Sequence, residues 1–151
     1  MKIIKFVMLL FFCLSVFLST SYAGQGIKWY SYKNGMIARE KNEKKVFIHF
    51  WTSWCGYCTK MEKKTFNDPR IIDYLNKNFI PIKVNAEKEK NIAVTYNVKG
   101  FPDNWFIAEK GKKIANQPGY LKPEKLLSIL KYIYSDSYKN MDYNSFLKGG
   151  K

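Results

Sequence analysis

The chain has 151 residues, of which 46% are hydrophobic, so it is long enough for one domain of ordinary size with a hydrophobic core. Its formal net charge is +14, but only Arg39 and Arg70 are arginines, and the lysines are scattered along the chain. Because arginine is the residue that favours bidentate contacts with phosphates and bases, we interpret the charge as a solvated surface and expect no nucleic acid as a partner.

The N-terminal segment has the pattern of a secretory signal peptide. Lys2 and Lys5 precede an uncharged apolar run over residues 6–18, and small side chains stand one and three positions before a cleavage point after Ala23. This pattern predicts export to the periplasm or another extracytoplasmic space. The alternative is an uncleaved segment that anchors the chain, and only in that case do we expect contact with a membrane.

The chain divides into three parts on this interpretation. We expect a signal peptide over residues 1–23, one domain over 24–137, and a tail over 138–151 with a short helix. No repeat and no Pro/Gly-rich break divides the central part. Cleavage would remove Cys13 and leave two cysteines in a compartment where disulfides are permitted.

Hydrophobic periodicity predicts the elements of the domain. Continuous β-branched and aromatic runs are typical of strands buried on both faces, whereas apolar residues every three or four positions are typical of helices. Asp68 before Pro69 is a cap followed by proline at the first helical position, and Pro123 opens the last helix. The sequence predicts helices over 31–42, 59–65, 69–77, 87–96 and 123–134, and strands over 46–51, 79–85, 105–108 and 113–116.

The order of these elements indicates the fold class. A turn over residues 109–112 should make the last two strands an antiparallel hairpin. The resulting order, β-α-β-α-β-β-α after an extra N-terminal helix, predicts an α/β protein with a central mixed sheet that is flanked by helices on both sides.

Cys55 and Cys58 could be a redox pair, half of a metal site or a structural disulfide. A structural zinc needs four ligands, and after cleavage the chain has no other cysteine and one histidine, His49, in a strand that we expect to be buried, so a closed site would need carboxylates. Covalent haem attachment requires a histidine directly after the second cysteine, where Thr59 stands. A disulfide that closes so small a loop stabilises little. We therefore expect no metal and no cofactor, and favour redox chemistry.

The placement of the two thiols suits such chemistry. Cys55 follows a strand and Cys58 lies in the first turn of a helix, whose N-terminus would lower a thiol pKa from about 8.5. We expect Gly56 to permit a tight turn, and Trp54 and Tyr57 to offer a flat apolar surface to a substrate peptide. Cys55 would attack a disulfide and Cys58 would resolve the mixed disulfide. The alternative is an inert pair in the core.

Residues 46–61, VFIHFWTSWCGYCTKM, resemble the active-site strand, loop and helix of the thioredoxin superfamily. Residues 80–102, IPIKVNAEKEKNIAVTYNVKGFP, are similar to the segment that ends in the cis-proline loop of that family, and the similarity extends over 28–135. The helix within 65–79, TFNDPRIIDYLNKNF, most resembles that of exported thioredoxin-like proteins of the thiol:disulfide interchange type. The resemblance implies the thioredoxin fold.

The resemblance also implies roles for residues outside the cysteine pair. Pro102 matches the cis-proline of the family, and the backbone of Phe101 would pair with an extended substrate. The chain departs from the family here: thioredoxins usually have threonine, valine or isoleucine in place of Phe101, and an apolar residue or threonine where Asp103 and Asn104 follow the proline.

His49 is a larger departure. It stands where thioredoxins generally keep a buried aspartate beneath the resolving cysteine, and Lys83 matches the usual lysine neighbour of that aspartate. The resemblance implies that His49 takes the proton from Cys58. Burial and Lys83 should both lower the pKa of His49 and keep it neutral, which suits a base. The alternative is a core histidine that is hydrogen-bonded to the backbone.

These features predict an exported thiol:disulfide oxidoreductase that acts on protein disulfides. In the family, cytosolic reductases typically carry Gly-Pro between the cysteines, strong oxidases Pro-His, and bacterial isomerases Gly-Tyr, as here. Those isomerases are dimers with an added domain, for which we expect no room in this chain. We therefore favour a reductant, with an isomerase second and a non-enzymatic thioredoxin-fold binding module as a further alternative. A reductant needs an electron donor, which we expect to be a membrane thiol transporter.

Overall fold

The computed structural model describes residues 26–149. The predicted signal peptide and Cys13 lie outside the described residues, so their interpretation stays a prediction. Within the described part of the chain, no helix is both long and apolar enough to cross a membrane.

Within the described residues, four strands form one mixed sheet: β1 (Lys45–Trp51), β2 (Phe79–Asn85), β3 (Asp103–Ile107) and β4 (Lys113–Pro118). Their order in the sheet is β2-β1-β3-β4. Strand β1 pairs in parallel with β2 and antiparallel with β3, and β3 pairs antiparallel with β4. The mixed sheet and the hairpin that the sequence predicts are thus confirmed.

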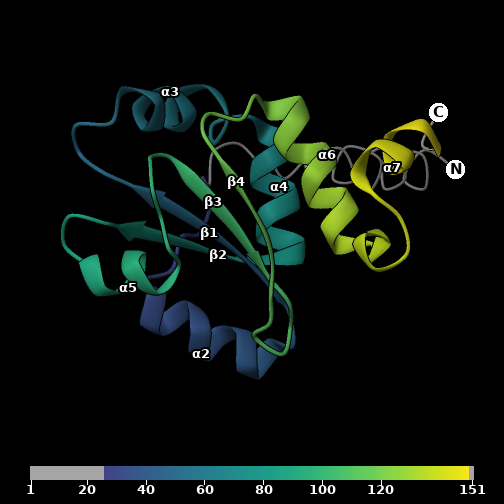
Figure 1. Cartoon of the computed structure of the whole chain (residues 1–151), viewed down its shortest axis with the longest axis horizontal. Helices are drawn as coiled ribbons and strands as arrows, with labels where there is room; N and C mark the ends of the chain where they lie inside the picture. The colour runs from purple at the N-terminus through teal and green to yellow at the C-terminus, as the bar shows by residue number, and fades with distance from the viewer. Residues whose placement is uncertain (1–25, 150–151) are drawn as a thin grey trace, which may run out of the picture.

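The helices are α2 (Tyr32–Asn42), α3 (Gly56–Lys64), α4 (Pro69–Asn78), α5 (Lys90–Thr95), α6 (Pro123–Tyr134) and α7 (Tyr143–Gly149), with a 3-10 helix η2 (Ser137–Lys139). Helices α2 and α5 cover one face of the sheet, and α3, α4 and α6 cover the other (Figure 1). Side chains of β1 alternate between the two cores. Phe47 enters the core of α3, α4 and α6, whereas Val46, Ile48 and Phe50 enter the core of α2 and α5.

Two elements begin two or three residues earlier than the sequence predicts. Helix α3 begins at Gly56 and not at Thr59, because Cys55 caps it. Strand β3 begins at Asp103 and not at Trp105, because its ladder with β1 continues to that residue. Strand β4 also runs two residues further than expected.

Helix α5 begins later than the sequence predicts, at Lys90 and not at Glu87. The side chain of Asn85 accepts hydrogen bonds from the backbone N–H groups of Glu87 and Lys88, at 2.9 and 3.4 Å. This local bonding fixes a turn in place of the first helical turn.

Lys45 is an exception to the prediction that the lysines form a solvated surface. Its side chain is buried at the start of β1, with its ammonium 2.5 Å from Glu109 Oε1 and 3.0 Å from Asp136 Oδ1. A buried charge requires such partners. The pair of contacts ties β1 to the β3–β4 turn and to the end of α6.

The tail beyond α6 packs against that helix. The ring centroid of Tyr132 on α6 lies 5.4 Å from that of Tyr143 and 5.2 Å from that of Phe146, both on α7. Where the domain ends and the tail begins remains a prediction.

The same leucine-to-alanine substitution can be made on the buried face of α6 and on the exposed surface of α7, and its effects on stability can be compared. Leu130 on α6 is fully buried, and Leu147 on α7 is 43% exposed. Leu130→Ala should lower the free energy of unfolding by about 2–5 kcal/mol, because it removes buried methyl groups and leaves a cavity. Leu147→Ala should change it by about 0.5 kcal/mol or less. Urea denaturation of both variants measures the difference; equal effects would contradict the described packing of α6.

Candidate active site

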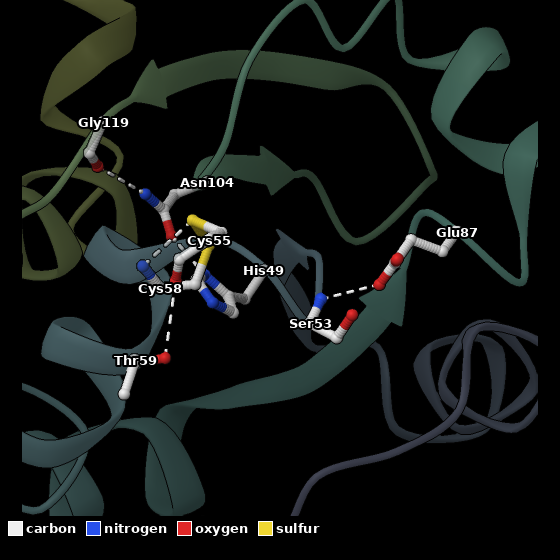
Figure 2. Close-up of a disulfide and its surroundings, with 8 residues drawn as sticks. All are labelled: His49, Ser53, Cys55, Cys58, Thr59, Glu87, Asn104 and Gly119. Atoms are coloured by element: carbon white, nitrogen blue, oxygen red, sulfur yellow. Dashed lines mark hydrogen bonds between the residues drawn. A yellow bond between two sulfur atoms is a disulfide. The ribbon is translucent and has the colours of Figure 1, made fainter.

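The Cys55–Cys58 disulfide lies at the start of α3, just after the end of β1 (Figure 2). Cys55 is the N-cap of α3, and its sulfur accepts a hydrogen bond from the backbone N–H of Cys58 at 3.1 Å. Both cysteines are buried, at 5% and 4% exposure. The positive end of the helix dipole therefore faces the sulfur of Cys55, which stabilises a thiolate there when the disulfide is reduced.

An exposed apolar rim borders the buried disulfide. Trp54 is 71% exposed and Tyr57 is 63% exposed. The Trp54 ring meets the Phe101 ring edge-on, with centroids 5.8 Å apart. The Phe101–Pro102 peptide bond is cis, which is the geometry that the resemblance implies. The rim thus brings together side chains from two segments far apart in the sequence.

Gly56 does not have the steric role that we expect from the sequence. A Cβ at Gly56 would meet no atom within 4 Å, and its φ is not among the positive ones. The turn between the thiols therefore does not require glycine, and that prediction is wrong. The missing side chain leaves the surface over the first turn of α3 uncovered.

Glu87 holds the loop before the disulfide, and the sequence analysis missed it. The Ser53 backbone N–H donates to Glu87 Oε2 at 2.6 Å (Figure 2). This hydrogen bond is the main reason that the pKa of Glu87 lies below its ordinary value. Only the turn at Asn85 brings Glu87 to this place, so no pattern around the cysteines could have indicated it.

His49 lies in the core on the same side of the sheet as α3, and it is 1% exposed. Its ring points toward the disulfide, on the side of Cys58 (Figure 2). The Phe66 ring packs edge-on against it, with centroids 4.8 Å apart. Its Nδ1 is hydrogen-bonded to Asn104 Oδ1 at 2.8 Å. The partner is thus a side chain and not the backbone, which differs from the inert core histidine of the alternative interpretation.

His49, Cys58 and Lys83 line one cavity of about 160 Å³. Lys83 is the direct neighbour of His49 in the β1–β2 register, and its ammonium lies 2.6 Å from Glu62 Oε2. The buried hydroxyl of Thr52 also lines the cavity and has no hydrogen-bond partner among residues 26–149. The full lining is His49, Trp51, Thr52, Ser53, Cys58, Thr59, Glu62, Lys63 and Lys83.

Glu62 is a further residue that the sequence analysis missed. It follows Cys58 by four positions on α3, so the two side chains share one face of that helix. This spacing is the signal that could have found it. Glu62 is 45% exposed in its side chain, so the cavity reaches solvent at the Glu62–Lys83 ion pair.

His49 is neutral at pH 7. Burial lowers its pKa to about 4, the hydrogen bond with Asn104 raises it, and the nearby Lys83 ammonium lowers it. The direction that the sequence analysis predicts for burial and for Lys83 is confirmed. Within residues 26–149, no three His, Cys, Asp or Glu side chains gather closely enough to hold a metal ion.

The sheet order, the capping disulfide and the cis-proline define a thioredoxin-like fold with a Cys-x-x-Cys disulfide. The profile of the thioredoxin-like domain family matches residues 32–134, so the chain belongs to this family. The chain is 28% identical over 88 residues to a protein disulfide-isomerase of Zea mays, a match that covers 57% of this chain and 17% of that protein.

One further relative and one solved structure are also similar to this chain. The chain is 28% identical over 81 residues to the thiol:disulfide interchange protein DsbD of Photorhabdus laumondii, covering 52% of this chain and 14% of that protein. The match thus spans less than a fifth of either relative's length. The solved structure of DsbH oxidoreductase superposes with a TM-score of 0.65 over 78% of this chain and 90% of that one, at 20% identity, which supports the fold.

Because His49 is the only histidine, its titration can be followed by proton NMR without assignment. The imidazole resonances should titrate with a midpoint near pH 4, since burial opposes the charged form. A midpoint near the ordinary value of about 6.5 would contradict the described burial.

The same pKa has a consequence for stability. Between about pH 6.5 and pH 4 the imidazole of His49 binds a proton in the unfolded state but not in the folded state. The contribution of His49 to the free energy of unfolding is therefore complete above about pH 6.5 and is lost as the pH falls toward 4. His49→Gln should remove this slope between about pH 6.5 and 5, where most carboxylates are still ionised.

Proposed function

We propose that this protein is a thiol:disulfide oxidoreductase that reduces protein disulfides with the Cys55–Cys58 dithiol. The observation that carries the proposal is the placement of the disulfide at the N-terminus of α3, with Cys58 lining the same cavity as His49 and an exposed apolar rim beside it. Cys-x-x-Cys at a helix N-terminus gives a thiolate that is both stabilised and nucleophilic near neutral pH.

The reaction proceeds in two exchanges. The Cys55 thiolate attacks one sulfur of a substrate disulfide; a Cys55–substrate bond forms, the substrate S–S bond breaks, and the departing substrate thiolate takes a proton. The Cys58 thiol then loses its proton and attacks the sulfur of Cys55, which expels the second substrate thiol. The substrate gains two electrons and the cysteine pair loses two.

His49 is the group that accepts the proton of Cys58. It is neutral at pH 7, it points toward Cys58, and both line the same cavity. A general base must have an unprotonated nitrogen within reach of the proton that it removes. The proton leaves His49 through the cavity, which reaches solvent beside Glu62 and Lys83.

The rim around the disulfide is the substrate surface. Trp54, Tyr57 and Phe101 offer ring faces and edges to a polypeptide, and the Phe101 ring, next to the cis Phe101–Pro102 peptide bond, meets the Trp54 ring. Aromatic side chains bury much area with few rotatable bonds, so they bind varied peptide segments.

An isomerase is the second candidate. The Gly-Tyr spacer and the identity to a plant protein disulfide-isomerase favour it. We place reduction first because the identity to a thiol:disulfide interchange protein extends over a similar length, and because an isomerase also depends on a reduced attacking thiol.

We also propose export and a membrane-bound electron donor. Residues 1–23 carry the signal-peptide pattern, which supports export. One relative of the chain is named a thiol:disulfide interchange protein, which supports exchange with another thiol protein as the electron donor. In an oxidising compartment a reductant must be re-reduced, and a membrane thiol transporter is the class of donor that can deliver electrons from the cytoplasm.

Cysteine variants test the function. The protein with dithiothreitol as donor should reduce insulin, and Cys55→Ser should abolish this activity. Cys58→Ser should instead accumulate a mixed disulfide with the substrate through Cys55, because resolution is lost. Mass spectrometry detects the adduct. Activity that persists in Cys55→Ser would contradict the proposal, and inactivity of the wild-type protein with every donor would favour a binding module.

The reduction potential of the pair separates the directions. A reductant should have a potential near the thioredoxin value of about −270 mV, whereas a value near about −120 mV belongs to an oxidant and would contradict reduction. Equilibration with glutathione buffers measures it.

Export has its own readout. N-terminal sequencing of the protein purified from the extracytoplasmic fraction should begin at Gly24, because cleavage follows Ala23. Recovery of the uncleaved chain from membranes would indicate an anchor instead.

A further inference from the structure

Asn104 joins His49 to the hairpin through both ends of its side-chain amide. Its Oδ1 lies 2.8 Å from His49 Nδ1, and its Nδ2 donates to the backbone carbonyl of Gly119 at 3.3 Å (Figure 2). Nδ2 also donates to the backbone carbonyl of Gln117 at 3.0 Å. Asn104 is fully buried and is the direct partner of His49 in the β1–β3 register. The two side chains are thus held in contact by the sheet itself.

The two carbonyl oxygens fix which way the Asn104 amide faces. A flipped amide would place its oxygen against the carbonyls of Gln117 and Gly119, where three acceptors would meet without a donor, in the interior where an unmade hydrogen bond is costly. Oδ1 therefore faces His49. An amide oxygen only accepts, so the hydrogen atom of this bond belongs to Nδ1 of His49.

A neutral imidazole carries one hydrogen, and the hydrogen bond of one ring nitrogen determines the state of the other. With Nδ1 protonated, Nε2 holds a free lone pair. The ring points toward Cys58 and lines the cavity that Cys58 also lines, whereas Nδ1 is turned to β3.

We propose that Asn104 is a positioning residue that holds His49 in its Nδ1–H tautomer and so directs the basic Nε2 lone pair at the cavity of the resolving Cys58. This inference rests on the proposed function for its catalytic consequence. In the opposite tautomer Nε2 carries the hydrogen and cannot accept a proton from the Cys58 thiol. The step is one proton transfer: the S–H bond of Cys58 breaks, an Nε2–H bond forms, and the thiolate pair of electrons attacks the sulfur of Cys55.

Nitrogen-15 NMR of the single histidine reads the tautomer directly. In the wild-type protein at pH 7, Nδ1 should give the shift of a protonated ring nitrogen and Nε2 that of an unprotonated one. Asn104→Ala should mix the two forms. The wild-type spectrum by itself decides the tautomer, so the test stands even if the alanine variant does not fold. A wild-type spectrum with Nε2 protonated would overturn the proposal.

Kinetics then test the consequence. The reduced protein is mixed with a substoichiometric disulfide-linked peptide dimer, and quenched samples are weighed by mass spectrometry, so that attack by Cys55 and resolution by Cys58 are timed separately. Asn104→Ala should slow resolution at least about tenfold and leave attack unchanged. The loss should not exceed the factor of about 10²–10⁴ that a general base supplies.

A double-mutant comparison separates positioning from a general loss of structure. His49→Ala should slow resolution, and adding Asn104→Ala to it should cause no further loss, because Asn104 acts through His49. An equal further loss in that background would overturn the proposal.

Asn116→Ala is the matched control. It removes a partly buried amide from the neighbouring β4, where Asn116 donates to Asp103 at 3.1 Å and does not contact His49. It should change neither the tautomer nor the resolution rate. A wild-type protein that leaves the peptide disulfide unreduced would refute the proposed function, while the NMR spectrum would still decide the tautomer.

Discussion

Burial of β1 on both faces is the constraint on which the site depends. Because side chains of a strand alternate, the apolar run of β1 fills two cores at once, and His49 is carried into the core beneath α3. Strand β1 pairs with β2 as far as Trp51 and with β3 as far as Phe50, so hydrogen bonds on both edges keep it extended. Its continuation then delivers Cys55 to the start of α3, above the side chain of His49. The proposed nucleophile, resolving thiol and base are therefore placed by one strand and the turn that follows it.

A histidine in such a core needs a partner, because an unpaired buried polar group costs free energy. Asn104 on the neighbouring strand is that partner, and its own amide is satisfied by the hairpin. Two departures from the thioredoxin pattern, at His49 and after Pro102, therefore form one unit in the structure. An apolar residue at position 104 would leave Nδ1 of His49 without this hydrogen-bond partner.

The sequence predicted the parts of the fold that depend on local pattern. Buried runs, proline-opened helices and the hairpin appear at the expected places, and the cysteine pair lies at a helix start. It could not predict contacts that depend on register. That His49 meets Asn104, and that Lys83 meets Glu62, follows from how strands and α3 align, which no single segment encodes. The burial of Lys45 could not be predicted for the same reason, because its partners Glu109 and Asp136 lie far along the chain.

Replacing a buried aspartate with a histidine reverses the effect of burial on the base. Burial disfavours the charged form, so it raises the pKa of a carboxylic acid and strengthens the carboxylate as a base, whereas it lowers the pKa of an imidazole and weakens it. A cation beside the imidazole lowers the pKa further, and Lys83 is that cation. The Glu62 carboxylate, 2.6 Å from the Lys83 ammonium, offsets its charge at the mouth of the cavity. The negative charge near Lys83 thus comes from Glu62 and not from the position of His49, and a His49 that acts as the proposed base would release its proton readily after each resolution.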